Sequence, residues 1–328
     1  MSDEGYILAG SDVRIGTLGV GTWAWGDKAT WGMGGYDADL SEATIAEAWQ
    51  TSIDAGVTLF DTAEVYGKGE SERIIGTVRA ADPERAAQAV IASKFMPQPW
   101  KLDVKRSLVA AAEASCERLG VDAIDLYQIH GPISLRGHAA LAKALAAAHE
   151  AGLVRAVGVS NYSAKETRSM DAELRKCGMR LATNQIEFSL LRTSPETGGL
   201  LATCAELGVV PLAYSPIGQG RLTGKYSAEH PPPGKRSFSA HPMAQVDVIV
   251  AELRRIGEEH GGKSPSQVAL RWIIEKGAVP IPGAKNAKQA ADNAGALGWT
   301  LDKTDIRALD AVAKHGIRSL QHIIWQHG

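Results

Sequence analysis

Short apolar stretches alternate with longer stretches of mixed polarity along most of the chain. The clearest apolar stretch is VTLFDTAEVYG, residues 57–67, whose β-branched and aromatic residues stop abruptly at Asp61. This run is typical of a buried strand, and the preceding SEATIAEAWQTSIDAG predicts a helix that ends at Gly56. The two make one helix-to-strand step, and this step recurs roughly every 30 to 35 residues along the chain.

The repeating pattern predicts eight strands, each built from β-branched and other apolar residues. They are expected within residues 18–21, 57–62, 89–95, 123–131, 154–163, 181–191, 209–218 and 278–286. The intervening segments predict helices at residues 71–80, 103–119, 141–150, 164–176, 195–207, 246–259 and 265–277. The last helix has Ser264 as its N-cap and Pro265 at its first position.

Strands that alternate with helices in this way are typical of α/β proteins with parallel sheets. No Gly-x-Gly-x-x-Gly fingerprint follows the first strand, so the pattern favours a closed (β/α)8 TIM barrel over a doubly wound sheet. We expect a single barrel domain over residues 1–328, with an N-terminal β-hairpin at residues 6–16. Residues 217–242, rich in Gly, Pro and basic side chains, predict a mobile lid loop after strand 7, within an insertion over about 217–259.

Composition narrows the classes of function. A chain of 328 residues with 45% hydrophobic residues can bury a large core, and its net charge of −2 offers no basic surface for nucleic acid or an anionic membrane. Cys116, Cys177 and Cys204 have no metal-binding or disulfide spacing, so we expect buried thiols and no metal site. No signal peptide or membrane-spanning run is apparent, and a cytoplasmic protein is predicted.

Polar residues stand where the predicted strands end. In a (β/α)8 barrel the carboxyl ends of the strands meet at one face, which carries the active site. The residues collected there are Asp61, Tyr66, Lys94, His130, Ser160, Asn161, Gln185, Tyr214 and Ser215. Singly, Asp61 could cap a turn, Lys94 could be a surface charge and His130 a satisfied core histidine. Together they indicate a functional site, because several ionisable groups gathered in one place lower stability unless they pair. A buried Asp61 in particular needs a partner such as lysine.

Eight stretches of the chain, in order and at matching spacing, resemble the motifs of the aldo-keto reductase family. They are GVGTW, FDTAEVYG, IASKF, YQIHG, GVSNYS, NQIEFSLL, AYSPIGQGRLTGKY and IPGAKNAKQAADN, and the resemblance covers about residues 13 to 314. GTWAWGD and the long lid are more similar to the plant and bacterial branch, with its pyridoxal reductase-like and potassium-channel β-subunit-like members. The resemblance implies a (β/α)8 barrel that uses NADPH to reduce aldehydes or ketones to alcohols.

The family's four catalytic positions fall on Asp61, Tyr66, Lys94 and His130, without substitution. These residue types suit the reaction, because hydride delivery to a carbonyl carbon leaves negative charge on the oxygen, which a nearby acid must neutralise. The resemblance makes Tyr66 this proton donor, and a neighbouring Lys94 ammonium would favour release of its proton. Asp61 would keep Lys94 charged and oriented, and a neutral His130 would orient the carbonyl oxygen.

The resemblance also places NADPH across the barrel mouth. Ser160, Asn161 and Gln185 would hold the carboxamide of the cofactor, and Tyr214 would stack on its nicotinamide ring. The other positions that match cofactor contacts of the family are Gly21, Thr22, Asp61, Ser215, Pro216, Ile217, Gly218, Gly220, Lys225 and Gly283.

Residues 283–293 follow the last predicted strand just before a helix, where barrel enzymes often bind phosphate. Lys285 is placed for the 2′-phosphate of NADPH, with Gln289 and Asn293 toward the adenine. Asn286 is either a helix cap or a phosphate ligand. These residues favour NADPH over NADH as the cofactor.

The substrate is expected to be a small-molecule carbonyl compound. Trp23, Trp25 and Trp31 lie in a Gly-rich loop, where they are either core residues or the lining of an apolar pocket. The residues expected to line the substrate pocket are Trp23, Trp25, Phe95 and Met96, with Trp325 as a further candidate. This aromatic lining favours aromatic or medium-chain aldehydes over small charged sugars.

Two other functions fit part of the pattern. The likeness to potassium-channel β-subunits allows an NADPH-binding, redox-sensing regulatory subunit with slow turnover. A Schiff-base aldolase would use Lys94 as a nucleophile at a strand end, but it leaves Tyr214 and the Lys285 segment without a role.

Overall fold

The computed structural model describes residues 4–26, 40–233, 241–317 and 323–328. Its strands are β1 (Tyr6–Ile7), β2 (Arg14–Ile15), β3 (Gly19–Gly21), β4 (Leu59–Asp61), β5 (Val90–Phe95), β6 (Ile124–Ile129), β7 (Val154–Ser160), β8 (Thr183–Glu187), β9 (Val210–Tyr214) and β10 (Val279–Pro280). Trp31 and residues 234–240 of the predicted lid lie outside the described residues.

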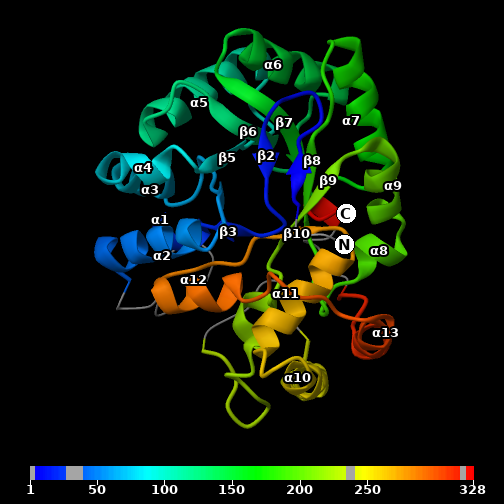
Figure 1. Ribbon diagram of the computed structural model, residues 1–328. Helices are drawn as coiled ribbons and strands as arrows, with labels where there is room; N and C mark the ends of the chain where they lie inside the picture. The colour runs from blue at the N-terminus through cyan, green and yellow to red at the C-terminus, as the bar shows by residue number, and fades with distance from the viewer. Residues whose placement is uncertain (1–3, 27–39, 234–240, 318–322) are drawn as a thin grey trace.

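Helices follow most of the strands and cover the outside of the barrel (Figure 1). They are α1 (Trp23–Gly26), α2 (Glu42–Asp54), α3 (Glu70–Ala81), α4 (Pro83–Ala86), α5 (Val104–Leu119), α6 (His138–Glu150), α7 (Ala164–Lys176), α8 (Ser194–Thr197), α9 (Leu200–Leu207), the 3-10 helix η1 (Gly218–Thr223), α10 (Met243–Glu259), α11 (Pro265–Glu275), α12 (Ala287–Ala294) and α13 (Lys303–Val312). In the described part of the chain, no helix has the length and apolar character needed to cross a membrane.

Strands β3 to β10 are parallel and pair in chain order, forming an eight-stranded sheet within the described residues. The ring closes where the Gly21 amide donates to the Pro282 carbonyl at 2.9 Å and Gly21 bridges Gly283. A Cβ at Gly21 would lie 2.8 Å from the Ile281 carbonyl oxygen, so a glycine is required for this close approach. The predicted (β/α)8 barrel is confirmed.

The hairpin β1–β2 closes the amino end of the barrel, as Figure 1 shows in blue. Leu8, Val13 and Ile15 pack against the inward-facing apolar residues of the strands, including Leu59 and Leu126. The amino end of the barrel is therefore filled by a packed apolar core. The polar inward-facing residues lie at the carboxyl ends of the strands, where the barrel is open.

The prediction of one continuous helix over residues 195–207 was wrong. The structure divides it into α8 and α9, because Gly199 has a φ of 79° and interrupts the helical backbone. The predicted helix start at Ser264 is confirmed. Its hydroxyl accepts from the Gln267 amide, and the Gln267 side chain accepts from the Ser264 amide. Such a cap contributes about 1 kcal/mol to stability.

Candidate active site

A lysine, an aspartate and a tyrosine meet inside the carboxyl end of the barrel. Asp61 ends β4 and Lys94 lies near the end of β5, so both side chains point inward from neighbouring strands. The Lys94 ammonium lies 2.5 Å from Asp61 Oδ2, 2.7 Å from the Thr62 carbonyl oxygen and 3.4 Å from the Tyr66 hydroxyl. These three acceptors match the three donors of an ammonium.

This ion pair is closed off from solvent, since Lys94 is 0% exposed and Asp61 is 2% exposed. Burial by itself opposes the charged ammonium, but the charges of Asp61 and Tyr66, with hydrogen bonds to both, leave the pKa of Lys94 raised above its ordinary value. Lys94 is therefore positively charged at neutral pH, and its charge lies beside the Tyr66 hydroxyl.

Two glutamines hold the other oxygen of Asp61. Gln185 donates to Asp61 Oδ1 at 2.7 Å and Gln128 donates to the same atom at 3.3 Å. The Gln128 carbonyl oxygen in turn accepts from the Thr183 hydroxyl at 3.2 Å. Gln185 was predicted as a site residue. Gln128 was missed, although its position two residues before His130 places both side chains on the inward face of one strand.

His130 follows β6 and is 7% exposed. Its ring lies edge-on to the Tyr66 ring at 5.7 Å and to the Trp325 ring at 5.5 Å, measured between ring centroids. Burial, and then the nearby Lys94 charge, lower the pKa of His130 well below its ordinary value. Its Nδ1 atom is buried and has no hydrogen-bond partner among the described residues. The imidazole is therefore neutral at physiological pH.

A cavity of about 920 Å³ extends from Asp61, Tyr66 and His130 to the start of α12. Most of the predicted cofactor residues line it, namely Gly21, Asp61, Ser160, Asn161, Gln185, Tyr214, Ser215, Pro216, Ile217, Gly220, Lys225, Gly283, Lys285, Asn286, Gln289 and Asn293. The structure does not place Thr22 and Gly218 on its wall. Thr22 is fully buried and its hydroxyl donates to the Asp61 carbonyl oxygen at 3.0 Å, while the Gly218 backbone is turned into the fold beside Leu191.

The far end of the cavity is positively polarised. Asn286 is the N-cap of α12, and its side-chain oxygen accepts from the Gln289 amide at 3.0 Å. Lys285 and Lys288 lie on the cavity wall beside this helix start. A helix N-terminus attracts anions, and two lysines reinforce the attraction. The arrangement suits a phosphate group.

Two predicted pocket tryptophans lie in different surroundings. Trp23 lines the cavity, as does Trp325. Trp25 does not, because its side chain is 1% exposed and its indole nitrogen donates to the Ala284 carbonyl oxygen at 2.7 Å. The prediction for Trp25 was wrong, since this residue packs in the core between β4 and the helices.

Phe95 and Met96 are also absent from the cavity wall. Phe95 directly follows Lys94 on β5, so its side chain points to the opposite face of the sheet and is fully buried among the outer helices. The Met96 amide donates to a Glu64 carboxylate oxygen at 2.6 Å. This contact holds the chain as it leaves β5. Phe95 was therefore wrongly predicted as a substrate contact, whereas the assignment of Met96, which is half-buried, stays a prediction.

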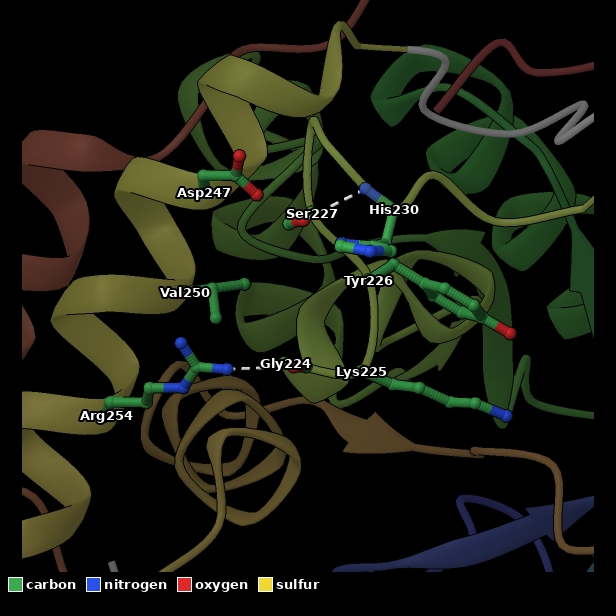
Figure 2. Close-up of a pocket in the computed structure, with 8 residues that line it drawn as sticks. All are labelled: Gly224, Lys225, Tyr226, Ser227, His230, Asp247, Val250 and Arg254. Carbon is green, nitrogen blue, oxygen red and sulfur yellow. Dashed lines mark hydrogen bonds between the residues drawn. The ribbon is translucent and has the colours of Figure 1, made fainter.

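The described arm of the predicted lid, residues 224–233, is held by α10. Arg254 donates to the Gly224 carbonyl oxygen at 2.8 Å, and Asp247 accepts from the Ala228 amide at 2.9 Å. Figure 2 shows Arg254 and Asp247 on α10 facing this arm, while the Lys225 side chain points away from the helix. These residues line a small cavity of about 300 Å³. Lys225 lines the main cavity. The arm thus carries a cation to the cavity wall.

The family of the chain follows from comparison with known proteins. The model of the Aldo/keto reductase family matches residues 17–314. The chain therefore belongs to the aldo/keto reductase family of oxidoreductases, as the motifs predicted.

Several relatives are similar over most of their length. The chloroplastic pyridoxal reductase of Arabidopsis thaliana is 36% identical over 327 residues, which covers 96% of this chain and 87% of the relative. A 6-dehydroglucose reductase of Novosphingobium aromaticivorans is 32% identical over 296 residues, covering 87% of this chain and 90% of the relative.

Solved structures show the same fold. The glycerol dehydrogenase of Gluconobacter oxydans has a TM-score of 0.80 and 29% identity, and the match covers 95% of each chain. An aldo/keto reductase of Klebsiella pneumoniae in complex with NADP and acetate has a TM-score of 0.74 at 23% identity, covering 96% of this chain and 97% of that one. At that identity the second comparison concerns the fold alone.

The neutral His130 predicts a pH dependence of stability. Because folding lowers the pKa of His130 from about 6.5, the unfolded chain binds one more proton than the folded chain at pH values between the two pKa values. Its contribution lowers the free energy of unfolding as pH falls below about 6.5, by at most about 1.4 kcal/mol per pH unit. Replacing His130 with Gln should remove this contribution.

The measurement is urea unfolding of wild type and of His130→Gln at pH values from about 5 to 8. The difference in free energy of unfolding should shift in favour of the variant as the pH falls. His130→Asn checks that the result does not depend on the size of the replacement. Parallel stability curves for wild type and both variants would mean that His130 is not held neutral by the fold.

Proposed function

We propose that this protein reduces aldehydes or ketones to alcohols with NADPH. The observation that carries the proposal is the contact between the buried Lys94 ammonium and the Tyr66 hydroxyl, at the inner end of a long cavity with a positively polarised far end. A phenol beside a buried cation is suited to give up its proton, and a cavity of this shape is suited to a dinucleotide.

The donors on the cavity wall fit NADPH. Gln185, Ser160 and Asn161 offer amide and hydroxyl groups near Asp61, where the carboxamide would lie. Tyr214 offers an aromatic face beside them. Lys225 from the lid arm and Lys285 at the start of α12 would hold the pyrophosphate and the 2′-phosphate.

The cofactor, when bound, supplies a hydride to the carbonyl carbon of the substrate. Tyr66 donates its hydroxyl proton to the carbonyl oxygen, so that carbon gains the hydride and oxygen gains the proton. The phenolate that remains is stabilised by the Lys94 ammonium at 3.4 Å, and Asp61 keeps this ammonium paired and directed. His130, neutral and beside the Tyr66 ring, orients the carbonyl oxygen.

The substrate position is bounded by aromatic side chains. Trp23 and Trp325 line the cavity, and the Trp325 ring lies 5.5 Å from the His130 ring, measured between centroids. We infer that an aromatic or medium-chain aldehyde fits this site, because flat apolar surfaces stack on indole rings. The name of the Arabidopsis relative, a pyridoxal reductase, is consistent with an aromatic aldehyde.

The Schiff-base aldolase is disfavoured by the surroundings of Lys94. A nucleophilic amine must be uncharged and accessible. Lys94 is instead fully buried, its pKa is raised, and its donors are engaged by Asp61 and the Thr62 carbonyl. The intact group of Asp61, Lys94 and Tyr66 likewise favours an enzyme over a regulatory subunit with slow turnover.

Replacing Tyr66 with Phe should remove the proton donor. We expect kcat for NADPH-dependent reduction of an aromatic aldehyde such as nitrobenzaldehyde to fall at least about a hundredfold, because general acid catalysis contributes 10²–10⁴-fold. The dissociation constant for NADPH should change by less than about twofold, since the phenol is not a predicted phosphate or carboxamide ligand. Turnover is followed by NADPH absorbance.

Tyr6→Phe is the matched control for Tyr66→Phe, because it removes a tyrosine hydroxyl from the hairpin at the closed end of the barrel. Its turnover should equal that of wild type. Undiminished turnover in Tyr66→Phe would exclude Tyr66 as the acid. A wild-type protein without turnover on a panel of carbonyl compounds, despite NADPH binding, would favour the regulatory subunit.

Replacing Lys285 with Met should weaken NADPH binding selectively. A charge-assisted contact to the 2′-phosphate contributes about 1.5–3 kcal/mol, so we expect the dissociation constant for NADPH to rise at least about tenfold. That for NADH, which lacks this phosphate, should stay within about twofold. Lys303→Met, on α13 and away from the cavity wall, is the control. An equal loss of NADH and NADPH affinity would contradict the assignment of Lys285.

A further inference from the structure

Residues 323–328 lie against the carboxyl ends of β7, β8 and β9, in red in Figure 1. Within this segment, Trp325 lines the cavity and Gln326 is 4% exposed. Sequence reasoning missed Gln326 entirely. Gln326 contacts residues more than a hundred positions away in the sequence, so no local sequence pattern predicts these contacts.

The Gln326 side chain bridges two groups of the barrel. Its amide nitrogen lies 2.6 Å from Glu187 Oε2 and 2.8 Å from the Tyr214 hydroxyl. Glu187 is 2% exposed. A carboxylate only accepts hydrogen bonds, so the atom that faces Glu187 must be the nitrogen of the amide and not its oxygen. The two N–H groups are thereby divided between Glu187 and Tyr214.

The Tyr214 hydroxyl, which accepts a hydrogen bond from Gln326, also contacts the Asn161 side chain. The Tyr214 hydroxyl donates to Asn161 Oδ1 at 2.8 Å while it accepts from Gln326. Burial, and then the charge of Glu187, raise the pKa of Tyr214 well above its ordinary value, so its hydroxyl keeps the proton that it donates. Both hydrogen-bonding roles of this phenol are used, and this fixes where its ring lies.

Asn161 is also held directly. Its φ is 65°, in the left-handed region that asparagine adopts more readily than most residues with a side chain. The His327 amide donates to the Asn161 carbonyl oxygen at 3.1 Å. The segment therefore contacts Asn161 at the backbone through His327 and at the side chain through Gln326 and Tyr214.

The segment is itself anchored by the two residues that follow Gln326, namely His327 and Gly328. Arg192 donates to the Gly328 oxygen at 2.7 Å, and His327 Nδ1 lies 2.9 Å from a Glu166 carboxylate oxygen. A Cβ at Gly328 would lie 2.9 Å from Leu200, so the backbone is seated tightly there. These contacts fix the position of Gln326 beside β8 and β9.

We propose that Gln326 is a positioning residue for the nicotinamide half of the cofactor, acting through Tyr214 and Asn161. The inference rests on the proposed function, in which Tyr214 offers its ring to the nicotinamide and Asn161 its amide to the carboxamide. Gln326 lies behind Tyr214 and is absent from the cavity wall, so its effect passes through the orientation of the tyrosine.

The test compares two probes on wild type and Gln326→Met. NADP⁺ carries the nicotinamide, and 2′-phospho-ADP-ribose is the same molecule without it. Methionine keeps the length of glutamine but removes both donors. We expect the dissociation constant for NADP⁺ to rise about fivefold, as for loss of a hydrogen bond, and that for 2′-phospho-ADP-ribose to stay within about twofold. Isothermal titration calorimetry measures both.

A merely structural role would weaken both probes together, and this result would overturn the inference. Gln326→Ala, which leaves room for water beside Glu187, is the second variant should the methionine variant fold poorly, and the same selective loss is expected of it. Ile324→Ala, at a neighbouring residue that is 61% exposed, is the matched control and should bind both probes like wild type.

A double-mutant cycle identifies the route of the effect. In a Tyr214→Phe background the hydroxyl that Gln326 contacts is absent, so Gln326→Met should change NADP⁺ affinity by less than about twofold further. A full fivefold further loss would overturn the route through Tyr214. If wild type and Gln326→Met bind NADP⁺ equally well, this inference is refuted and the proposed function is not. A wild-type protein that does not bind NADP⁺ refutes the proposed function as well.

Discussion

A lysine and an aspartate buried together inside a barrel set the conditions for the rest of the site. Neither charge would be tolerated alone in that position, because an unpaired buried ion costs several kcal/mol. Lys94 and Asp61 come from neighbouring strands, and the parallel register places them within hydrogen-bond distance. The remaining acceptor capacity of Asp61 is taken by Gln128 and Gln185. The pair is thus satisfied on all sides, and the Lys94 charge faces Tyr66.

The barrel makes this arrangement possible by dividing its interior into two parts. At the amino end, Leu59, Leu126 and the hairpin residues form a packed apolar plug. Toward the carboxyl end, the next inward-facing residues on these two strands, Asp61 on β4 and Gln128 on β6, are polar. The rigid apolar part fixes the strands, and the strands fix the polar side chains. Precise placement of proton donors depends on such support.

Much of the fold and of the catalytic group could be predicted from the sequence, because both depend on local pattern. The strands have period-two or continuous apolar runs, and Asp61, Lys94 and His130 stand where those runs end. Phe95 was misplaced although the alternation of side chains along a strand puts it on the face opposite Lys94. The pair Gly198 and Gly199 likewise signalled the break between α8 and α9.

Other features could not be predicted, because they depend on contacts between distant parts of the chain. Trp25 packs in the core against Phe60, and its indole hydrogen is accepted by Ala284, far along the chain. Gln326 gains its place from Glu187 and Tyr214 on two different strands. Asn286 could be read as a cap or as a phosphate ligand, and the structure shows the cap while leaving the residue on the cavity wall.

The coupling between Asp61 and Lys94 is best measured directly, by the free energies of unfolding of Asp61→Leu, Lys94→Met and the double variant. Each single variant should lose about 3–5 kcal/mol, because it leaves one buried charge without its partner. The double variant should lose clearly less than the sum, since it leaves neither charge. Losses that add to within about 0.5 kcal/mol would contradict a mutually dependent buried pair, and with it the foundation of the site.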